Sequence, residues 1–270
     1  MRKLGQHFLV DYPLLDRLVE YGQILDKDVV LEVGAGTGEL TWRLAERAGR
    51  VIAVEIDEKL VEEASRKLSK YNNVELITGD ILKVKYKIRG FNKVVSNPPY
   101  QISTKLMHWL IVSLPERIVL TLQRDFAQKI TSPPGSKKYV YTSFLANLSY
   151  KCKIIEDVPR NLFKPMPRVD SVVILMERID GEIIPGEEEL KLVKILFTQK
   201  TKKLRNTLKA VSGRLQLSFK EIEENLSGEL LNERVYRIEP LSLYKCVETI
   251  IQLTANSIHC EDKYFRLTSH

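Results

Sequence analysis

Short, mostly apolar runs alternate with amphipathic segments of helical spacing through the first half of the chain. The apolar runs cover residues 29–33, 51–55, 74–77, 91–96 and 118–122, and helical patterns cover 13–22, 39–47, 58–70 and 103–112. Runs of this kind are typical of strands that are covered on both faces. Their alternation with helices predicts an α/β fold with a parallel, doubly wound sheet. Asp11 and Asp57 stand where two of the helices need an N-cap.

The pattern changes after a turn-rich stretch, Ser-Pro-Pro-Gly-Ser, at residues 132–136. We expect later strands, or pieces of strand and helix, at 143–150, 153–158 and 171–177. Asp-Gly and Pro-Gly pairs then punctuate the chain at 180–181 and 185–186, and the remainder is mainly helical. The sequence therefore predicts a large α/β domain over residues 1–184 and a small helical domain over residues 185–270.

Composition limits the classes of protein to which the chain can belong. Its 270 residues are 44% hydrophobic and carry a formal net charge of +7, which permits a polyanionic partner without requiring one. No apolar run approaches the roughly 18–20 residues that span a bilayer, and no hydrophobic signal segment follows the first residues. We therefore expect a cytoplasmic protein with no membrane segment. Nothing suggests an obligate interface, so we expect a monomer.

The cysteines and histidines show no spacing typical of a metal site. Cys152, Cys246 and Cys260 are odd in number and far apart, and the four histidines form no pair at i, i+3 or i+4. We therefore expect neither a bound metal nor a disulfide framework.

A glycine-rich turn after the first buried strand is the strongest local signal. Gly34, Gly36 and Gly38 occupy alternate positions just before a helix, and such a turn lets a nucleotide-like ligand approach the backbone and the free N–H groups of the helix. A dinucleotide site needs its third glycine one residue later. Glu32, just before the turn, repels a pyrophosphate but suits the cationic amino-acid end of S-adenosylmethionine (AdoMet). A plain strand-to-helix turn is the alternative.

Two acidic residues at the ends of the next strands extend this interpretation. Glu55 can accept hydrogen bonds from both ribose hydroxyls, and Asp80 from the adenine amine of the ligand. We include the following residues, Ile56 and Ile81, in the expected AdoMet site. The alternatives are a solvated charge at a strand end for Glu55 and an ordinary turn residue for Asp80.

Asn97-Pro98-Pro99-Tyr100, at the end of the fourth strand, carries the most specific chemistry. The prolines stiffen the loop and remove two N–H donors. The Asn97 amide oxygen and the Pro98 carbonyl can hold the hydrogens of an exocyclic amine, whose lone pair then faces a methyl donor. Tyr100 offers a face on which a base can stack. Because the sulfonium is already a good leaving group, alignment suffices and no strong base is needed; a rigid turn is the alternative.

Several motifs occur together and in order. They are Lys3-x-x-Gly-Gln-His-Phe-Leu9, Leu31-Glu-Val-Gly-Ala-Gly-Thr-Gly38, Val54-Glu55-Ile56-Asp57, Gly79-Asp80, Asn97-Pro-Pro-Tyr100 and Phe163-Lys-Pro-Met-Pro-Arg-Val-Asp-Ser171. Over nearly its whole length the chain resembles the ribosomal RNA adenine N6,N6-dimethyltransferase family. Asn-Pro-Pro-Tyr at residues 97–100, where bacterial members often carry Asn-Leu-Pro-Tyr, resembles the archaeal and eukaryotic branch.

The resemblance implies a Rossmann-like class I AdoMet-dependent methyltransferase domain over residues 1–184 and an RNA- or ribosome-docking domain over 185–270. The implied reaction dimethylates two adjacent adenosines near the 3′ end of small-subunit ribosomal RNA, as a part of ribosome biogenesis, and leaves S-adenosylhomocysteine. The implied AdoMet contacts are His7, Leu9, Gly34, Glu55, Asp80 and Asn97. Asn97, Pro98 and Tyr100 are implied to hold the target adenine, and Phe163, expected to be exposed in the site, to stack on its other face. His7 stands where many relatives carry asparagine.

A basic stretch at residues 197–209 is the candidate RNA-binding surface. It contains five basic residues and no acidic one, and we expect Lys200, Lys202, Lys203 and Arg205 to contact phosphates. Lys137, Lys138 and Arg124 are candidates to extend the patch. The alternative is a solvated helix face, since Leu204 and Leu208 are spaced like core positions.

Two other functions remain open from the sequence. A DNA adenine-N6 methyltransferase shares the Asn-Pro-Pro-Tyr chemistry, but such enzymes usually carry a dedicated sequence-reading domain. A ribosome- or nucleic-acid-binding assembly factor without activity is the non-enzymatic alternative. The intact glycine turn and the intact residues 97–100 disfavour it.

Overall fold

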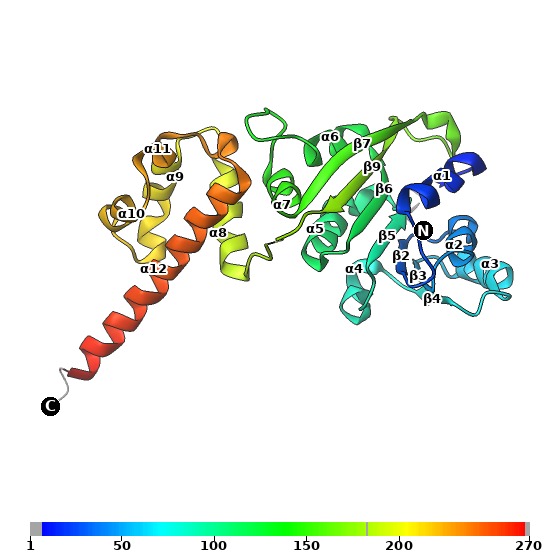
Figure 1. The fold of residues 1–270 in the computed structure, drawn as a ribbon, viewed down its shortest axis with the longest axis horizontal. Coiled ribbons are helices and arrows are strands. Elements are labelled where there is room, and N and C mark those ends of the chain that lie inside the picture. The colour runs from blue at the N-terminus through cyan, green and yellow to red at the C-terminus, as the bar shows by residue number, and fades with distance from the viewer. Residues whose placement is uncertain (1–6, 182, 268–270) are drawn as a thin grey trace. The chain divides into compact units, whose positions relative to one another are not determined.

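The computed structural model describes residues 7–181 and 183–267 (Figure 1). Within them the chain forms two compact units. The first contains the residues up to 131 and those from 149 to 181, and the second contains residues 132–148 and those from 183 onward. The chain passes from the first unit to the second near residue 182, close to the expected domain boundary at 184. Segment 132–148, which we expected in the first domain, belongs to the second unit.

A seven-stranded sheet organises the described part of the first unit, in the order β4-β3-β2-β5-β6-β9-β7. The strands are β2 (Val29–Val33), β3 (Arg50–Glu55), β4 (Val74–Thr78), β5 (Lys93–Ser96), β6 (Arg117–Gln123), β7 (Tyr150–Val158) and β9 (Ser171–Arg178). The helices are α1 (Tyr12–Gly22), α2 (Glu39–Ala45), α3 (Glu58–Leu68), α4 (Ile81–Val84), α5 (Ser103–Ser113) and α6 (Arg124–Ile130), with 3₁₀ turns at Lys85–Lys87, Tyr100–Ile102 and Arg160–Leu162. The predicted strands and helices of the first half are confirmed to within a few residues.

The direction in which the strands are added reverses next to β2. The chain passes from β2 through β3 to β4 on one side, then returns to place β5 and β6 on the other side, with all neighbouring pairs parallel. The carboxyl ends of strands beside such a reversal frame a ligand crevice. The predicted parallel arrangement is confirmed for β2 to β6, whereas β9, for which the sequence predicted no direction, pairs antiparallel with both β6 and β7. The connection from β7 to β9, residues 159–170, contains a 3₁₀ turn and β8 but no α-helix of the kind that usually makes a parallel crossover.

Helix caps agree with the sequence. The side chain of Asp11 accepts the N–H of Leu14 at 2.8 Å, and that of Asp57 accepts the N–H of Lys59 at 3.0 Å. Each satisfies one of the unpaired N–H groups at the start of a helix. These caps place α1 and α3 where the sequence predicts them.

A two-stranded sheet, which the sequence did not suggest, joins the N-terminal segment to a distant loop. β1 (Phe8–Leu9) pairs antiparallel with β8 (Phe163–Lys164), with Leu9 opposite Phe163. The N–H of Val10 continues the ladder to the carbonyl of Leu162 at 2.9 Å. This pairing brings two motifs more than 150 residues apart to one side of the crevice.

The described part of the second unit is helical. Its helices are α7 (Tyr141–Ser149, whose last residue begins the return to the first unit), α8 (Glu187–Thr198), α9 (Leu204–Val211), α10 (Phe219–Asn225), α11 (Gly228–Asn232) and α12 (Pro240–Leu267), with 3₁₀ turns at Ser212–Leu215 and Val235–Arg237. Tyr139 and Phe144 each pack on Phe197, with ring centroids 5.7 Å apart. This aromatic contact explains why segment 132–148 belongs to the second unit. Helix α7 also replaces the strand considered at 143–150, and the strand begins only at Tyr150.

Two features are missing from the residues that the structure describes. None of the helices there has the length and apolar character needed to cross a membrane. No group of three or more metal-ligating side chains is found among the same residues.

Candidate active site

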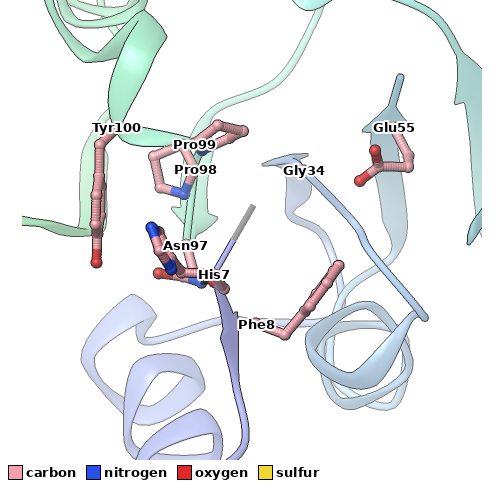
Figure 2. A pocket seen from close by; sticks show the side chains of 8 residues that line it. All are labelled: His7, Phe8, Gly34, Glu55, Asn97, Pro98, Pro99 and Tyr100. Carbon is pink, nitrogen blue, oxygen red and sulfur yellow. Dashed lines mark hydrogen bonds between the residues drawn. The ribbon is translucent and has the colours of Figure 1, made fainter. Parts of the chain in front are cut away.

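Two adjoining pockets open at the carboxyl ends of β2, β3, β4 and β5. The first, the asparagine pocket, encloses about 400 Å³ and is lined by His7, Phe8, Gly34, Glu55, Asn97, Pro98, Pro99 and Tyr100. The second, the aspartate pocket, encloses about 500 Å³ and is lined by Val33, Gly34, Val54, Glu55, Ile56, Gly79, Asp80, Ile81, Pro99, Gln101 and Ile102. Gly34, Glu55 and Pro99 line both pockets. Figure 2 shows Asn97 and Tyr100 on one side of the asparagine pocket and Glu55 on the other, with Gly34 between them.

The glycine turn is shaped so that no side chain fits between β2 and the Asn-Pro-Pro-Tyr loop. Gly34 has a φ of +82°, and a Cβ atom added to it would lie 3.2 Å from Cδ of Pro99. Its N–H donates to the carbonyl of Val54 at 2.8 Å, which ties the turn to β3. The turn therefore requires glycine at this position, both for the positive φ and for the close approach.

Glu55 is held in a single orientation by the backbone around it. Its side chain is 4% exposed. One carboxylate oxygen accepts the N–H groups of Ile56 and Asp57 at 2.9 and 3.0 Å, and the other accepts the N–H of Gly36 at 2.9 Å. The structure thus places an oriented acceptor between the two pockets, where the sequence predicted one.

Asp80 lines the aspartate pocket and also caps a helix. Its Oδ1 accepts the N–H of Leu82 at 2.9 Å at the start of α4. Ile81, 4% exposed, and the half-exposed Ile56 form apolar walls of the same pocket. Asp80 can therefore be a turn residue that caps α4 and still line the ligand site.

Asn97 presents a buried acceptor that is without a partner. Its Nδ2 donates to the backbone carbonyl of His7 at 3.4 Å, which orients the amide. Its Oδ1 is buried and accepts no hydrogen bond from any described residue. An unsatisfied buried acceptor costs about 1–3 kcal/mol, and most buried polar atoms in native proteins have a partner. The amide oxygen is therefore placed to receive a donor from a ligand.

Aromatic rings form the wall beside Asn97. The hydroxyl of Tyr100 lies 2.6 Å from Oγ of Ser171, and burial raises the pKa of this phenol. The His7 ring stacks near Tyr100 at 5.9 Å, and Nδ1 of His7 donates to the carbonyl of Pro165 at 2.7 Å. Phe163 meets Tyr100 edge-on, with centroids 6.5 Å apart. The Tyr100 ring is thus fixed on several sides.

The expectation that Phe163 is exposed in the site is wrong. Its side chain is 2% exposed and packs in the same apolar core as Leu9 and Val158. The reason is the pairing of β1 with β8, which sets Leu9 opposite Phe163 and covers the ring.

A third hollow, of about 390 Å³, lies behind the glycine turn and contains a buried acid. Leu9, Glu32, Gly34, Gly36 and Thr37 are among its lining residues. Glu32 is 1% exposed, and its Oε2 has no hydrogen-bond partner among the described residues. Burial raises the pKa of this carboxyl to about 8, and the negative charge of Glu55 adds to the rise. The sequence marked Glu32 as an acid near the ligand but did not reveal that it is buried.

The four expected RNA contacts lie in the second unit and differ from one another. Nζ of Lys200 donates to the backbone carbonyls of Lys137 and Tyr139 at 2.9 and 2.6 Å. Arg205 forms an ion pair with Glu223, and Nζ of Lys203 lies 3.5 Å from Oδ1 of Asn232. Lys202 is exposed and has no side-chain partner among the described residues. The structure therefore gives Lys200 a structural role instead of a free cation.

The sheet order, the glycine turn and the crevice at the strand ends define a class I methyltransferase with a Rossmann-like fold. The family model for ribosomal RNA adenine dimethylase matches residues 1–238. The chain therefore belongs to this family. Its fold and its place in the family imply that AdoMet is the methyl donor.

Individual relatives agree with this assignment. A probable ribosomal RNA small subunit methyltransferase A of Methanosarcina acetivorans is 37% identical over 92% of this chain and 93% of its own length. The protein of the same description from Thermococcus onnurineus is 38% identical over 88% of this chain and 87% of its own length. Among solved structures, a dimethyladenosine transferase from Plasmodium falciparum matches with a TM-score of 0.82 at 26% identity, covering 92% of this chain and 98% of that one. The 23S rRNA methyltransferase ErmE matches with a TM-score of 0.62 at 25% identity, covering 89% and 99%.

Proposed function

We propose that this protein transfers methyl groups from AdoMet to the N6 amines of two adjacent adenosines near the 3′ end of small-subunit ribosomal RNA. The observation that carries the proposal is the buried, unpartnered Oδ1 of Asn97 at the carboxyl end of β5. The family and the named relatives support ribosomal RNA as the substrate.

The residues around the two pockets fit AdoMet. When bound, AdoMet supplies an electrophilic methyl group on a sulfonium that leaves readily. The oriented carboxylate of Glu55 is suited to ribose hydroxyls, and Asp80, between Ile56 and Ile81, to the adenine amine. Gly34 and Gly36 leave the backbone open to the ligand, and the acid Glu32 lies behind the turn on the side proposed for the ligand's cationic amino-acid end. Both ends of the ligand therefore meet complementary groups.

The asparagine pocket fits the reacting adenine. Oδ1 of Asn97 and the carbonyl of Pro98 accept the two hydrogens of the N6 amine, so that the nitrogen lone pair is directed toward the methyl group. Tyr100 provides the stacking face, and Phe163 holds the Tyr100 ring at its edge instead of stacking on the adenine itself. His7 closes the pocket beside Tyr100, and its carbonyl orients the Asn97 amide.

Orientation of the amine is the main catalytic contribution of the chain. The N6 lone pair is delocalised into the adenine ring, and acceptors on its hydrogens favour a pyramidal nitrogen that can attack the methyl carbon. When AdoMet is bound, the nitrogen–carbon bond would form as the methyl–sulfur bond breaks and S-adenosylhomocysteine leaves. The amine proton would then pass to water, because the methylated amine is cationic and acidic. Positioning and fixed dipoles of this kind supply a large share of enzymatic rate enhancement.

Phosphate contacts from the second unit help to hold the RNA. Lys202, Lys203 and Arg205 remain candidates: Lys202 is exposed without a side-chain partner among the described residues, and the exposed contacts of Lys203 and Arg205 exchange readily for phosphate. Lys200 is excluded, since its ammonium clamps two carbonyls. Contacts of this kind fix the register of the RNA and leave base selection to the pocket.

The test combines two substrates. Purified protein is incubated with labelled AdoMet and either undermethylated small ribosomal subunits or duplex DNA, and the labelled nucleosides are identified. N6,N6-dimethyladenosine in ribosomal RNA is the expected product. Label in DNA would favour a DNA adenine-N6 methyltransferase. Tight binding to the subunits with no transfer to either substrate would favour a non-enzymatic assembly factor.

A further inference from the structure

A polar groove, distinct from the three hollows described above, opens at the end of β6 in the first unit. Its volume, open solvent included, is about 990 Å³, and Arg124, Arg160, Arg168, Gln123, Gln128 and Asp170 are among its lining residues. The residues come from the end of β6, the start of α6 and the segments on both sides of β8. We call it the arginine groove.

The arginine groove begins beside the wall of the asparagine pocket. Gln123, which lines the groove, is paired with Ser171 across β6 and β9. Oγ of Ser171 in turn lies 2.6 Å from the hydroxyl of Tyr100. One pair of residues therefore separates the groove from the ring proposed to stack on the target adenine.

The side chains that line the groove carry a net positive charge, because three arginines outnumber two aspartates. Asp125 is paired with Lys129 at 2.6 Å, and Oδ1 of Asp170 accepts the backbone N–H of Arg160 at 3.0 Å. The guanidinium groups of Arg160 and Arg168 are exposed and form no ion pair with any described residue. The two exposed guanidinium groups, together with this net charge, suit an anionic ligand.

Arg124 has a partner, but a weak one. Its guanidinium lies 2.9 Å from Oδ1 of Asp157, with the two side chains 40% and 69% exposed. Exposed pairs of this kind contribute at most about 1 kcal/mol. Arg124 can therefore exchange Asp157 for a phosphate at little cost.

We propose that the arginine groove binds the ribonucleotide that adjoins the target adenosine, with Arg160 and Arg168 on the phosphates beside it. This proposal rests on the proposed function. A base that is taken out of its stack into the asparagine pocket brings its neighbouring phosphates to the rim of that pocket. Planar guanidinium groups suit phosphate oxygens, and the amides of Gln123 and Gln128 offer both donors and acceptors to a base edge or a 2′-hydroxyl.

The experiment uses binding as its first readout, so that it does not depend on methyl transfer. The probe is a ribosomal RNA fragment that carries the two target adenosines, either unmodified or with one phosphate at a time replaced by an uncharged methylphosphonate. The test variant is Arg160→Gln with Arg168→Gln. The control, Arg47→Gln with Arg66→Gln, removes two exposed arginines of the same unit, one just after α2 and one in α3, and changes the net charge equally. Melting temperatures confirm that both variants fold.

The test variant should bind the RNA about tenfold more weakly than the wild type, with unchanged AdoMet affinity, whereas the control should match the wild type. Methylphosphonates beside the target adenosines should weaken the wild type but have no further effect on the test variant. The proposal is overturned if both variants bind alike, or if the sensitive phosphates are remote from the target. It is also overturned if only binding to intact subunits is weakened, because the groove then takes a protein segment. If the wild type binds the RNA with this pattern of phosphate sensitivity but transfers no methyl group, the proposed function is refuted and the groove proposal is not.

Discussion

Replacement of Glu32 by glutamine should change how the stability of the protein depends on pH. Burial raises the pKa of Glu32 from 4.5 to about 8, so the folded protein keeps a proton that the unfolded chain releases. Stability contributed by this group is therefore present at low pH and is lost as the pH rises from about 4.5 to about 8. Glutamine has no proton to lose, and the variant should lack this decline.

The magnitude follows from the span of pH. Each unit of pH between the two pKa values is worth about 1.4 kcal/mol. Between pH 5 and pH 7 the free energy of unfolding of the Glu32→Gln protein should therefore rise by about 3 kcal/mol relative to the wild type.

The assay is urea unfolding at pH 5, 6, 7 and 8, followed by the fluorescence of Trp42 and Trp109, both of which lie in the first unit. Glu62→Gln, which removes an exposed carboxylate from α3, is the matched control and should parallel the wild type. Parallel stability curves for wild type and Glu32→Gln would refute the reasoning that Glu32 is protonated in the folded, ligand-free protein.

Three further predictions test the site and the second unit. Glu55→Ala should weaken AdoMet binding at least tenfold in calorimetry, because the oriented acceptor is lost; unchanged affinity would remove Glu55 from the ligand site. Gly34→Ala should lower stability by about 1–2 kcal/mol and abolish AdoMet binding, since its Cβ meets Pro99 at 3.2 Å and its φ is +82°; a variant that binds AdoMet normally would contradict the close approach. Lys200→Met should destabilise the protein by about 1–3 kcal/mol, because two carbonyls lose a charged donor. Lys202→Gln should leave the melting temperature unchanged and weaken RNA binding. The reverse pattern would make Lys200 the RNA contact.

Much of the fold was predictable because its signals are local. The apolar runs of β2 to β6, the caps Asp11 and Asp57 and the glycine turn each depend on a few neighbouring residues. The position of the crevice was predictable because the carboxyl ends of parallel strands meet at one edge of a sheet. Glu55 and Asn97 could be placed there from their positions alone.

The parts that sequence reasoning missed depend on contacts between distant segments. β1 and β8 are two residues long and too short for any periodicity, yet their pairing buries Phe163. The role of Lys200 depends on carbonyls more than 60 residues away. A strand pattern also does not state its direction, so the antiparallel β9 could not be told from a parallel strand.

The central claim is that the Asn97 amide oxygen orients the adenine amine, and a single-turnover rate tests it most directly. Methyl transfer to undermethylated small subunits is measured for wild type, Asn97→Ala and Asn72→Ala, which removes an exposed asparagine in the same unit, with AdoMet and subunits both saturating. The account predicts a rate about 100-fold lower for Asn97→Ala, by analogy with the loss of one fixed polar group at a reacting centre, and a wild-type rate for Asn72→Ala. A rate for Asn97→Ala within threefold of the wild type would contradict it.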